Sequence, residues 1–141
     1  MPKVTRIDHI AILSNDIQEN LSFWRDALGL NLTKVLDVPT EQSKVAFLPV
    51  GNSEIEIVQP TSLDSGLARY LEKRGAGMHH ICLEVDDIQG MLSVLQEKGI
   101  QLIHEVPVKS PDGKQYAFIH PKSANGVLVE LYEMSTENSD K

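Results

Sequence analysis

An internal repeat is the strongest constraint on the fold of this chain. The segment IDHIAI at residues 7–12 recurs as MHHICL at residues 78–83, and DIQ at residues 16–18 recurs at residues 87–89, each 71 positions later (78 − 7 and 87 − 16). Self-similarity at a fixed offset indicates a duplicated supersecondary unit. We therefore expect two copies of one structural motif.

Each copy is predicted to run strand, helix and then three short strands, which is a βαβββ module. The prediction rests on apolar residues that recur with the strand period at some places and the helix period at others. In the first copy we expect strands at residues 6–13, 30–37, 44–50 and 54–59 and a helix at residues 17–28. In the second copy we expect strands at residues 78–85, 101–106, 115–120 and 127–132 and a helix at residues 88–98.

Cap residues support the predicted helices. Asp16 and Asp87 precede them at equivalent places, where a carboxylate can accept hydrogen bonds from the free amides of the first turn. A short helix over residues 65–75, which Ser65 could cap and Gly75 could end, is predicted to link the two copies. The first helix should present one apolar stripe to a sheet, made of Ile17, Leu21, Trp24 and Leu28.

These elements predict an α+β fold in which two βαβββ modules form a curled mixed β-sheet. A chain of 141 residues is the size of one domain, which we place at residues 1–134. The copies then cover residues 4–60 and 76–133, and the polar run at residues 135–141 is expected to be a frayed tail.

Composition narrows the class of partner. A net charge of −7 and a pI near 5.1 argue against nucleic acid or an anionic membrane, because both require a basic face. Cys82 is the only cysteine, which rules out an intrachain disulfide and favours a reducing compartment. No apolar stretch long enough for a signal sequence or a membrane span is present, so a cytoplasmic location is expected.

Strand alternation places one histidine of each copy on the face away from the helix. Ile10 and its neighbours at even positions form an aliphatic face, so His9 and Ala11 point the other way, and His80 and Cys82 do the same in the second copy. A lone histidine in a strand is usually structural, but the duplication favours a shared function. His79, which faces opposite to His80, is expected to be structural or on the surface, and the same is expected of Asp8.

The last strand of each copy carries a glutamate between aliphatic residues. Glu56 in IEI matches Glu130 in VEL, and both should lie on the same face as the histidines. A carboxylate there is costly to bury without a cation or hydrogen-bond partners. If the modules pack around a pseudo-twofold axis, His9, Glu56, His80 and Glu130 converge into one divalent-metal site.

Two imidazoles and two carboxylates suit a divalent ion, and Co, Zn, Ni, Mn and Mg all stay open as its identity. An octahedral ion bound by four protein ligands keeps two positions for substrate oxygens. Cys82 lies two residues from His80 on the same face, but a small apolar lining residue explains it without ligation.

The chain resembles the vicinal oxygen chelate superfamily and, within it, the methylmalonyl-CoA epimerases, over nearly the whole span from Val4 to Glu133. The segments that carry the resemblance are IDHI at 7–10, LEKRG at 71–75, GMHHI at 77–81, EVDDI at 84–88, and FIHPKS at 118–123 leading to GVLVEL at 126–131. The metal ligands of the family fall on His9, Glu56, His80 and Glu130.

The resemblance implies interconversion of the two epimers of methylmalonyl-CoA. A proton is removed between the thioester and the carboxylate and returned on the other face, through a metal-stabilised enolate. Glu130 corresponds to the family's acid/base glutamate, whereas a carboxylate that some members carry in the third strand is replaced by Ala46. Lys122 and Ser123 could contact the substrate carboxylate or the CoA phosphates.

Other functions of the same fold stay open at this point. A glyoxalase I-like lyase would use a similar ligand set on a glutathione hemithioacetal, although the HPKS segment at residues 120–123 favours the epimerase. The loop at residues 109–114 departs from the glycine-rich loop of many epimerases. An extradiol dioxygenase or a non-catalytic small-molecule-binding protein fits four intact ligands less well. The resemblance also implies a homodimer that binds an acyl-CoA.

Overall fold

The computed structural model describes residues 1–134, which divide into two compact units. The first half is residues 9–79, and the second half joins residues 1–8 to the chain from residue 80 onward. In this division the start of the first strand belongs to the second half, and the copy bounds of 4–60 and 76–133 stay a prediction. The predicted frayed tail, residues 135–141, lies outside the described residues.

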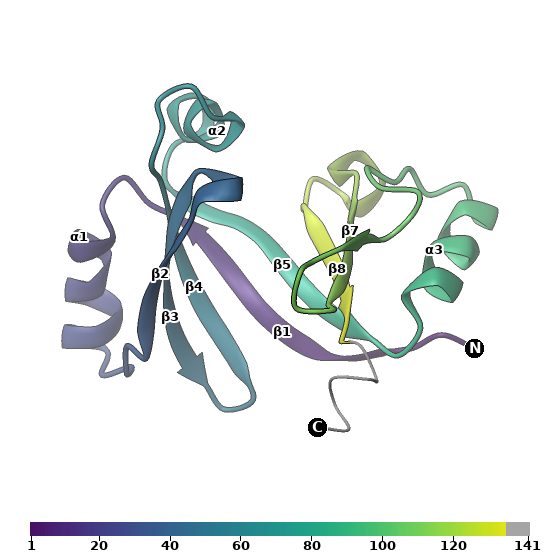
Figure 1. The fold of residues 1–141 in the computed structure, drawn as a ribbon, viewed down its shortest axis with the longest axis horizontal. Coiled ribbons are helices and arrows are strands. Elements are labelled where there is room, and N and C mark those ends of the chain that lie inside the picture. Colours follow the sequence, from purple (N-terminus) through teal and green to yellow (C-terminus); the bar gives the residue numbers. More distant parts are fainter. Residues whose placement is uncertain (135–141) are drawn as a thin grey trace. The chain divides into compact units, whose positions relative to one another are not determined.

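The first half is one βαβββ module followed by a helix (Figure 1). Its strands are ordered β2-β3-β4-β1, with β4 parallel to β1 and antiparallel to β3, so the sheet is mixed as predicted. The elements are β1 (Val4–Leu13), α1 (Ile17–Leu21), a π-helical turn (Ser22–Ala27), β2 (Lys34–Val38), a 3-10 turn (Pro39–Glu41), β3 (Ser43–Val50), β4 (Ser53–Pro60) and α2 (Gly66–Arg74).

The second half repeats the module with the same topology. Its strands are ordered β1-β5-β8-β7-β6, where β8 is parallel to β5 and antiparallel to β7. Helix α3 lies beside β7 and β8 (Figure 1). The elements are β5 (Gly77–Val85), α3 (Ile88–Glu97), β6 (Val108–Lys109), β7 (Gln115–Ile119), a 3-10 turn (Pro121–Ala124) and β8 (Val129–Glu133).

The predicted helix caps are confirmed. The Asp16 carboxylate accepts a hydrogen bond from the Gln18 amide at 3.0 Å, and Asp87 accepts one from the Gly90 amide at 3.0 Å. Ser65 caps α2 in the same way, and Gly75 ends it with a φ of 84°, a conformation that glycine adopts without a Cβ clash. Each helix therefore begins where its sequence signal lies.

The first helix departs from the predicted regular stripe. After Leu21 it widens into a π-helical turn, in which the Leu28 amide donates to the Phe23 carbonyl five residues back at 2.8 Å. The wider turn rotates the last position away from the sheet. Ile17 is buried as predicted, but Leu28 is 55% exposed and does not belong to the core.

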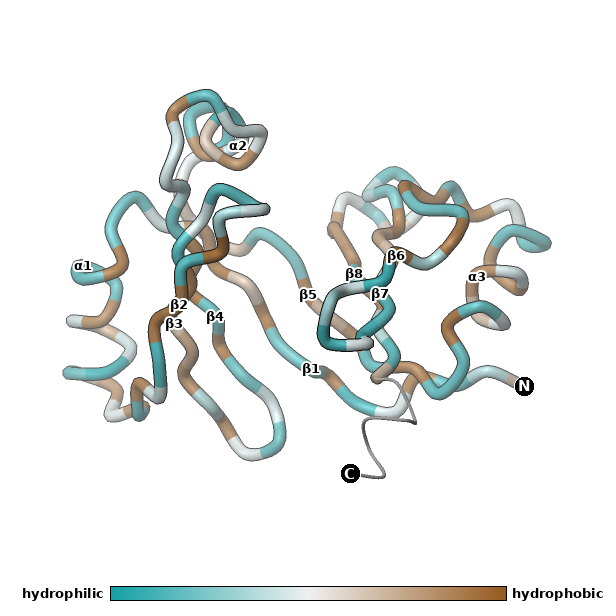
Figure 2. The backbone as a smooth tube through the Cα atoms, viewed as in Figure 1, coloured by the Kyte–Doolittle hydropathy of each residue, from teal (hydrophilic) through white to brown (hydrophobic). Residues whose placement is uncertain are grey.

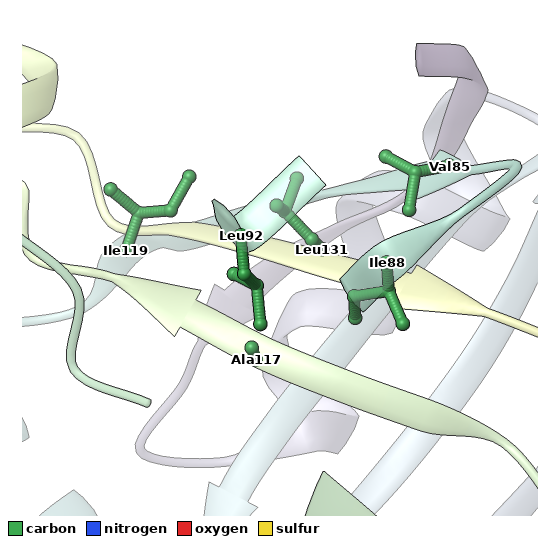
Figure 3. Packing of buried hydrophobic residues seen from close by; sticks show 6 residues of the cluster. All are labelled: Val85, Ile88, Leu92, Ala117, Ile119 and Leu131. Carbon is green, nitrogen blue, oxygen red and sulfur yellow. The ribbon is translucent and has the colours of Figure 1, made fainter. Parts of the chain in front are cut away.

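Each half has its own hydrophobic core between the helix and the sheet. Along β4, hydrophilic and hydrophobic residues alternate, so one face is apolar (Figure 2). The first core is built from Ile17, Leu21, Ala46, Leu48 and Ile57. The second is built from Val85, Ile88, Leu92, Ala117, Ile119 and Leu131, which Figure 3 shows pointing toward one another.

Two strand predictions differ from the structure. The strand expected at residues 30–37 begins only at Lys34, because Leu30 and Leu32 instead pack on the first core from a loop. The strand expected at residues 101–106 is reduced to one bridge, Leu102 to Ile119, and the edge strand β6 comes later. In both halves the apolar residues cover the core without forming a ladder. Among residues 1–134, no helix is long and apolar enough to cross a membrane.

Candidate metal centre

In the first half, His9 and Glu56 form a close pair on the face of the sheet opposite to the hydrophobic core. The His9 Nδ1 atom lies 3.2 Å from Glu56 Oε2, and the two side chains are 6% and 16% exposed. His9 belongs to β1 and Glu56 to β4, two parallel neighbours in the sheet. This pairing confirms that strand alternation places both residues on one face.

The second half contains the equivalent pair. The His80 Nε2 atom lies 3.1 Å from Glu130 Oε1, and these side chains are 13% and 12% exposed. They come from β5 and β8, which correspond to β1 and β4 of the first half. Each predicted ligand histidine thus has its predicted glutamate beside it.

The spacing within each pair suits ligation of a metal ion. Two ligand atoms about 2.1 Å from one ion and at right angles to each other are about 3 Å apart. The measured nitrogen to oxygen distances of 3.1 and 3.2 Å fit such adjacent positions. Buried carboxylates paired with imidazoles also need a cation or hydrogen bonds to offset lost hydration.

The strands around the two pairs have the same register. In the first half Glu56 stands opposite Ala11 on one side and Phe47 on the other. In the second half Glu130 stands opposite Cys82 and Phe118 in the same manner. We call Ala11, Glu56 and Phe47, and likewise Cys82, Glu130 and Phe118, the ligand row of each half.

The two phenylalanines are part of the site that the sequence analysis missed. The Phe118 ring packs edge-on against the His80 imidazole with centroids 5.4 Å apart, so it restricts how that ligand can turn. Phe47 occupies the matching place in β3. The repeat offset that relates His9 to His80 also relates these residues, and that signal could have found them.

A second missed feature anchors the ligand strands to the helices. Three residues after Glu56, the Gln59 side chain accepts a hydrogen bond from the Ile17 amide at 2.9 Å. Three residues after Glu130, Glu133 accepts one from the Ile88 amide at 2.7 Å. Each glutamate strand is therefore tied to the first turn of its helix.

Cys82 lies beside Glu130 with its side chain fully buried. Burial, together with the neighbouring Glu130 and Asp8 carboxylates, raises the pKa of the Cys82 thiol well above its usual value. The thiol thus stays protonated and faces a carboxylate as a weak hydrogen-bond donor. This arrangement favours a lining role, as predicted, over ligation by a thiolate.

Next to the ligand row, the second half carries a polar network. Arg6 Nε donates to Glu84 Oε1 at 3.0 Å, and Arg6 Nη2 donates to Asp8 Oδ1 at 2.8 Å. The Tyr132 hydroxyl donates to Glu84 Oε2 at 2.8 Å. The Lys114 ammonium lies 4.4 Å from the centre of the Tyr132 ring. Asp8 is therefore held in this network by its salt bridge to Arg6.

The same network keeps the Tyr132 hydroxyl neutral. Burial contributes most to raising the pKa of this hydroxyl, and its hydrogen bond to Glu84 and the nearby Asp8 carboxylate raise it further. Despite partial burial, the Glu84 and Asp8 carboxylates also raise the pKa of the Arg6 guanidinium. The network next to the ligand row therefore combines the charged side chains of Arg6, Asp8 and Glu84 with the neutral phenol of Tyr132.

The structure places Ala46 in the first core. The sequence comparison put this residue where some family members carry a catalytic carboxylate, but its side chain is fully buried in the first core with Leu48 and Leu21. A carboxylate there would lie under the helix. Because β3 alternates, the neighbouring Val45 and Phe47 are the residues on the face of Glu56.

Lys122 and Ser123 lie in the 3-10 turn before β8. The Ser123 hydroxyl accepts a hydrogen bond from the Gln101 amide at 2.9 Å, so it holds a loop in place. Lys122 is exposed, and its amide donates to His120 Nδ1 at 3.0 Å. His79 packs edge-on against Tyr70 with ring centroids 4.8 Å apart, which agrees with its predicted structural role.

Comparison with known proteins agrees with this geometry. Residues 8–118 match the model of the Glyoxalase/Bleomycin resistance protein/Dioxygenase superfamily. The chain is 37% identical to the mitochondrial methylmalonyl-CoA epimerase of Mus musculus over 92% of its length and 73% of the relative. It is 35% identical to an ethylmalonyl-CoA/methylmalonyl-CoA epimerase of Cereibacter sphaeroides, covering 93% and 99%.

A solved structure is similar over nearly the whole chain. A variant of the Streptomyces coelicolor methylmalonyl-CoA epimerase, in complex with 2-nitronate-propionyl-CoA, is 28% identical with a TM-score of 0.83 and covers 95% of this chain and 97% of its own. The fold, the duplicated His–Glu pairs and the sequence identity all point to the same family. This chain belongs to the methylmalonyl-CoA epimerases of the Glyoxalase/Bleomycin resistance protein/Dioxygenase superfamily.

Proposed function

We propose that this chain interconverts the two epimers of methylmalonyl-CoA by proton transfer at the carbon between the thioester and the carboxylate. The observation that carries the proposal is the His–Glu pair built twice in the same register, in a chain 37% identical to an epimerase. Loss of that proton leaves a planar enolate. Protonation of its other face gives the opposite epimer, so the reaction consumes no other reactant.

The proposed ligand set of one divalent ion is His9, Glu56, His80 and Glu130. The fit of each pair to adjacent ligand positions supports it, as does the choice of imidazole and carboxylate donors. When bound, a divalent ion supplies Lewis-acid polarisation of the thioester carbonyl and electrostatic stabilisation of the negative charge that develops on its oxygen. Co, Zn, Ni, Mn and Mg all suit these donors.

Glu130 is proposed as an acid/base that exchanges a proton with the substrate carbon. Its side chain is 12% exposed, so little water competes for the proton. Cys82 beside it keeps its own proton, since its pKa is raised by burial and the Glu130 carboxylate. Among the ligand-row neighbours of Glu130, therefore, Cys82 can donate a hydrogen bond but cannot accept the substrate proton.

The ligand of the Streptomyces relative supports an enolate route. A nitronate is planar and anionic, as is the enolate formed from a malonyl thioester. The binding of 2-nitronate-propionyl-CoA to an epimerase of the same fold supports a reaction through such a species here.

Lys122 and Ser123 are proposed contacts of the acyl-CoA. The exposed Lys122 ammonium suits a carboxylate or phosphate, and the turn that holds Ser123 presents its backbone at the start of β8. A homodimer and a cytoplasmic location stay predictions of the sequence.

The proposal is tested with a single epimer of methylmalonyl-CoA in D₂O, followed by proton NMR and by optical resolution of the product. Protein stripped with a chelator is compared with protein reloaded with one divalent ion. Metal-dependent deuterium uptake with inversion is expected. Folded, metal-loaded protein that exchanges no deuterium would contradict the assignment, and a glutathione hemithioacetal would then be the next substrate to test.

A further inference from the structure

His104 lies next to Phe118, the last residue of the ligand row in the second half. The His104 ring lies 5.9 Å from the Phe118 ring and 6.0 Å from the Tyr116 ring, measured between centroids. Phe118 in turn contacts His80. His104 is thus separated from a proposed metal ligand by a single aromatic ring, on the same face of the sheet.

A backbone hydrogen bond fixes the tautomer of the His104 imidazole. His104 Nδ1 accepts from the Phe118 amide at 3.0 Å, so that nitrogen carries no proton and the neutral ring must hold its proton on Nε2. His104 is half-buried, and residues 1–134 supply no acceptor for its Nε2–H group. The Nε2–H group is therefore a fixed donor on the site face that meets no acceptor among residues 1–134.

The first half carries a polar side chain at the matching place. The Thr33 amide donates to the Phe47 carbonyl at 3.0 Å, as the Ile103 amide donates to the Phe118 carbonyl at 2.9 Å. The residues that follow are Lys34, whose ammonium lies 4.9 Å from the Phe47 ring centre, and His104. In both halves, a side chain with a nitrogen donor therefore packs against the phenylalanine of the ligand row, which packing alone does not require.

We propose that His104 is a specificity-determining residue that donates its Nε2–H group to an oxygen of the acyl-CoA. The inference rests on the proposed function, because it takes the acyl group to bind at His80 and Glu130. His104 acts as a neutral donor and not as the second acid/base, since protonation at Nδ1 would break the bond from the Phe118 amide. No bond to carbon forms or breaks at His104.

Two oxygens of the substrate have the required chemistry. One is the carboxylate of the malonyl group, and the other is a carbonyl of the thioester or of the adjoining pantetheine. Both are acceptors that a single N–H donor can bind. Methylmalonyl-CoA and propionyl-CoA distinguish them, because propionyl-CoA lacks the carboxylate and keeps every carbonyl.

The sharpest variant is His104→Asn. The asparagine Oδ1 replaces Nδ1 as the acceptor for the Phe118 amide, but nothing replaces the Nε2–H donor. His104→Gln keeps the donor and loses the acceptor, because its longer amide can place an N–H group near the position of Nε2. A role in packing alone would not separate these two variants, whereas the proposed hydrogen bond does.

Binding of methylmalonyl-CoA and propionyl-CoA to the metal-loaded protein is measured by calorimetry, alongside kcat and KM for epimerisation. For His104→Asn we expect about tenfold weaker binding and a higher KM, the size of one lost hydrogen bond, with kcat changed less. His104→Gln should recover most of the affinity. Weaker binding of both thioesters assigns the acceptor to a carbonyl, and weaker binding of methylmalonyl-CoA alone assigns it to the carboxylate.

Three results would overturn the inference. The first is binding of both thioesters by His104→Asn with wild-type affinity, and the second is equal impairment of His104→Asn and His104→Gln. In the third, nitrogen NMR would find the proton of His104 on Nδ1. Failure of the epimerase proposal is a separate outcome, seen as wild-type protein that binds methylmalonyl-CoA without deuterium exchange. In that case the calorimetric comparison of the variants still decides the role of His104.

Discussion

The two halves share a ligand row but differ in the row of residues next to it. In the first half that neighbouring row is aliphatic, and it consists of Leu13, Val58, Val45 and Leu36. In the second half the equivalent places in β5, β8 and β7 hold Glu84, Tyr132 and Tyr116. The duplication therefore kept the His–Glu pair twice and placed polar and aromatic groups beside only one copy.

This difference assigns unlike tasks to two glutamates that occupy equivalent places. Glu56 has Ala11 and Phe47 beside it, which offer no proton. Glu130 has a protonated thiol beside it and a phenol in the next row. We infer that Glu56 serves as a ligand, whereas Glu130 also exchanges protons with the substrate.

The largest expected effect separates these glutamates. Glutamine keeps an amide oxygen for ligation but cannot take up the substrate proton. Glu130→Gln should lower kcat by about 10²- to 10⁴-fold, the usual contribution of a general acid/base. Glu56→Gln should retain most of kcat, as followed by deuterium uptake in D₂O. Equal losses in the two variants would remove the distinction between the halves.

Substitution of the core alanines tests the symmetry of the halves. Ala46 and Ala117 are both fully buried beneath a helix, at equivalent positions of β3 and β7. Ala46→Glu and Ala117→Glu should each lower the free energy of unfolding by about 3 kcal/mol or more, because an unpaired charge is buried. Urea denaturation measures this, with Ala46→Ser and Ala117→Ser as controls. A stable Ala46→Glu protein would show that this position does not face the core.

The polar row should contribute to stability in the second half only. Tyr132→Phe removes the hydroxyl that donates to Glu84 at 2.8 Å and leaves that half-buried carboxylate short of a partner. We expect a loss of about 1–3 kcal/mol in the free energy of unfolding. Val58→Thr at the equivalent place in β4 gains no such partner and serves as the comparison. No loss in Tyr132→Phe would indicate that water replaces the hydroxyl.

A smaller effect is expected at alkaline pH. The folded-state pKa of Tyr132 is raised, so the unfolded chain loses the phenol proton first, from its ordinary pKa of 10.0. The contribution of Tyr132 to stability is therefore full below pH 10 and should fall as pH rises further. Cys82, whose ordinary pKa is 9.0, should begin the same loss one pH unit lower.

The double variant Cys82→Ala with Tyr132→Phe should reduce this alkaline slope, as measured by denaturation at several pH values. Unchanged slopes would mean that other groups cause the loss of stability above pH 9. Leu13 and Val58 of the first half carry no titratable group, so they offer sites for neutral control substitutions.

The repeat predicted both modules and all four candidate ligands, because strand alternation and a constant offset act over short stretches of chain. It could not predict the π-helical turn that exposes Leu28, which depends on backbone geometry within the helix. It also could not show that the Ala46 side chain points into the first core, because a shift of one residue in a strand reverses the side. The polar network of Arg6 with Glu84 joins residues far apart in sequence, and no local pattern indicates it.

The most direct test of the account is the metal content of the chain with either histidine removed. If His9, Glu56, His80 and Glu130 form one centre, elemental analysis of reloaded wild type should give one divalent ion per chain. His9→Ala and His80→Ala should then each lose that ion, although each substitution leaves the other His–Glu pair intact. Two ions per wild-type chain, or a retained ion in one variant only, would contradict a single centre made from both halves.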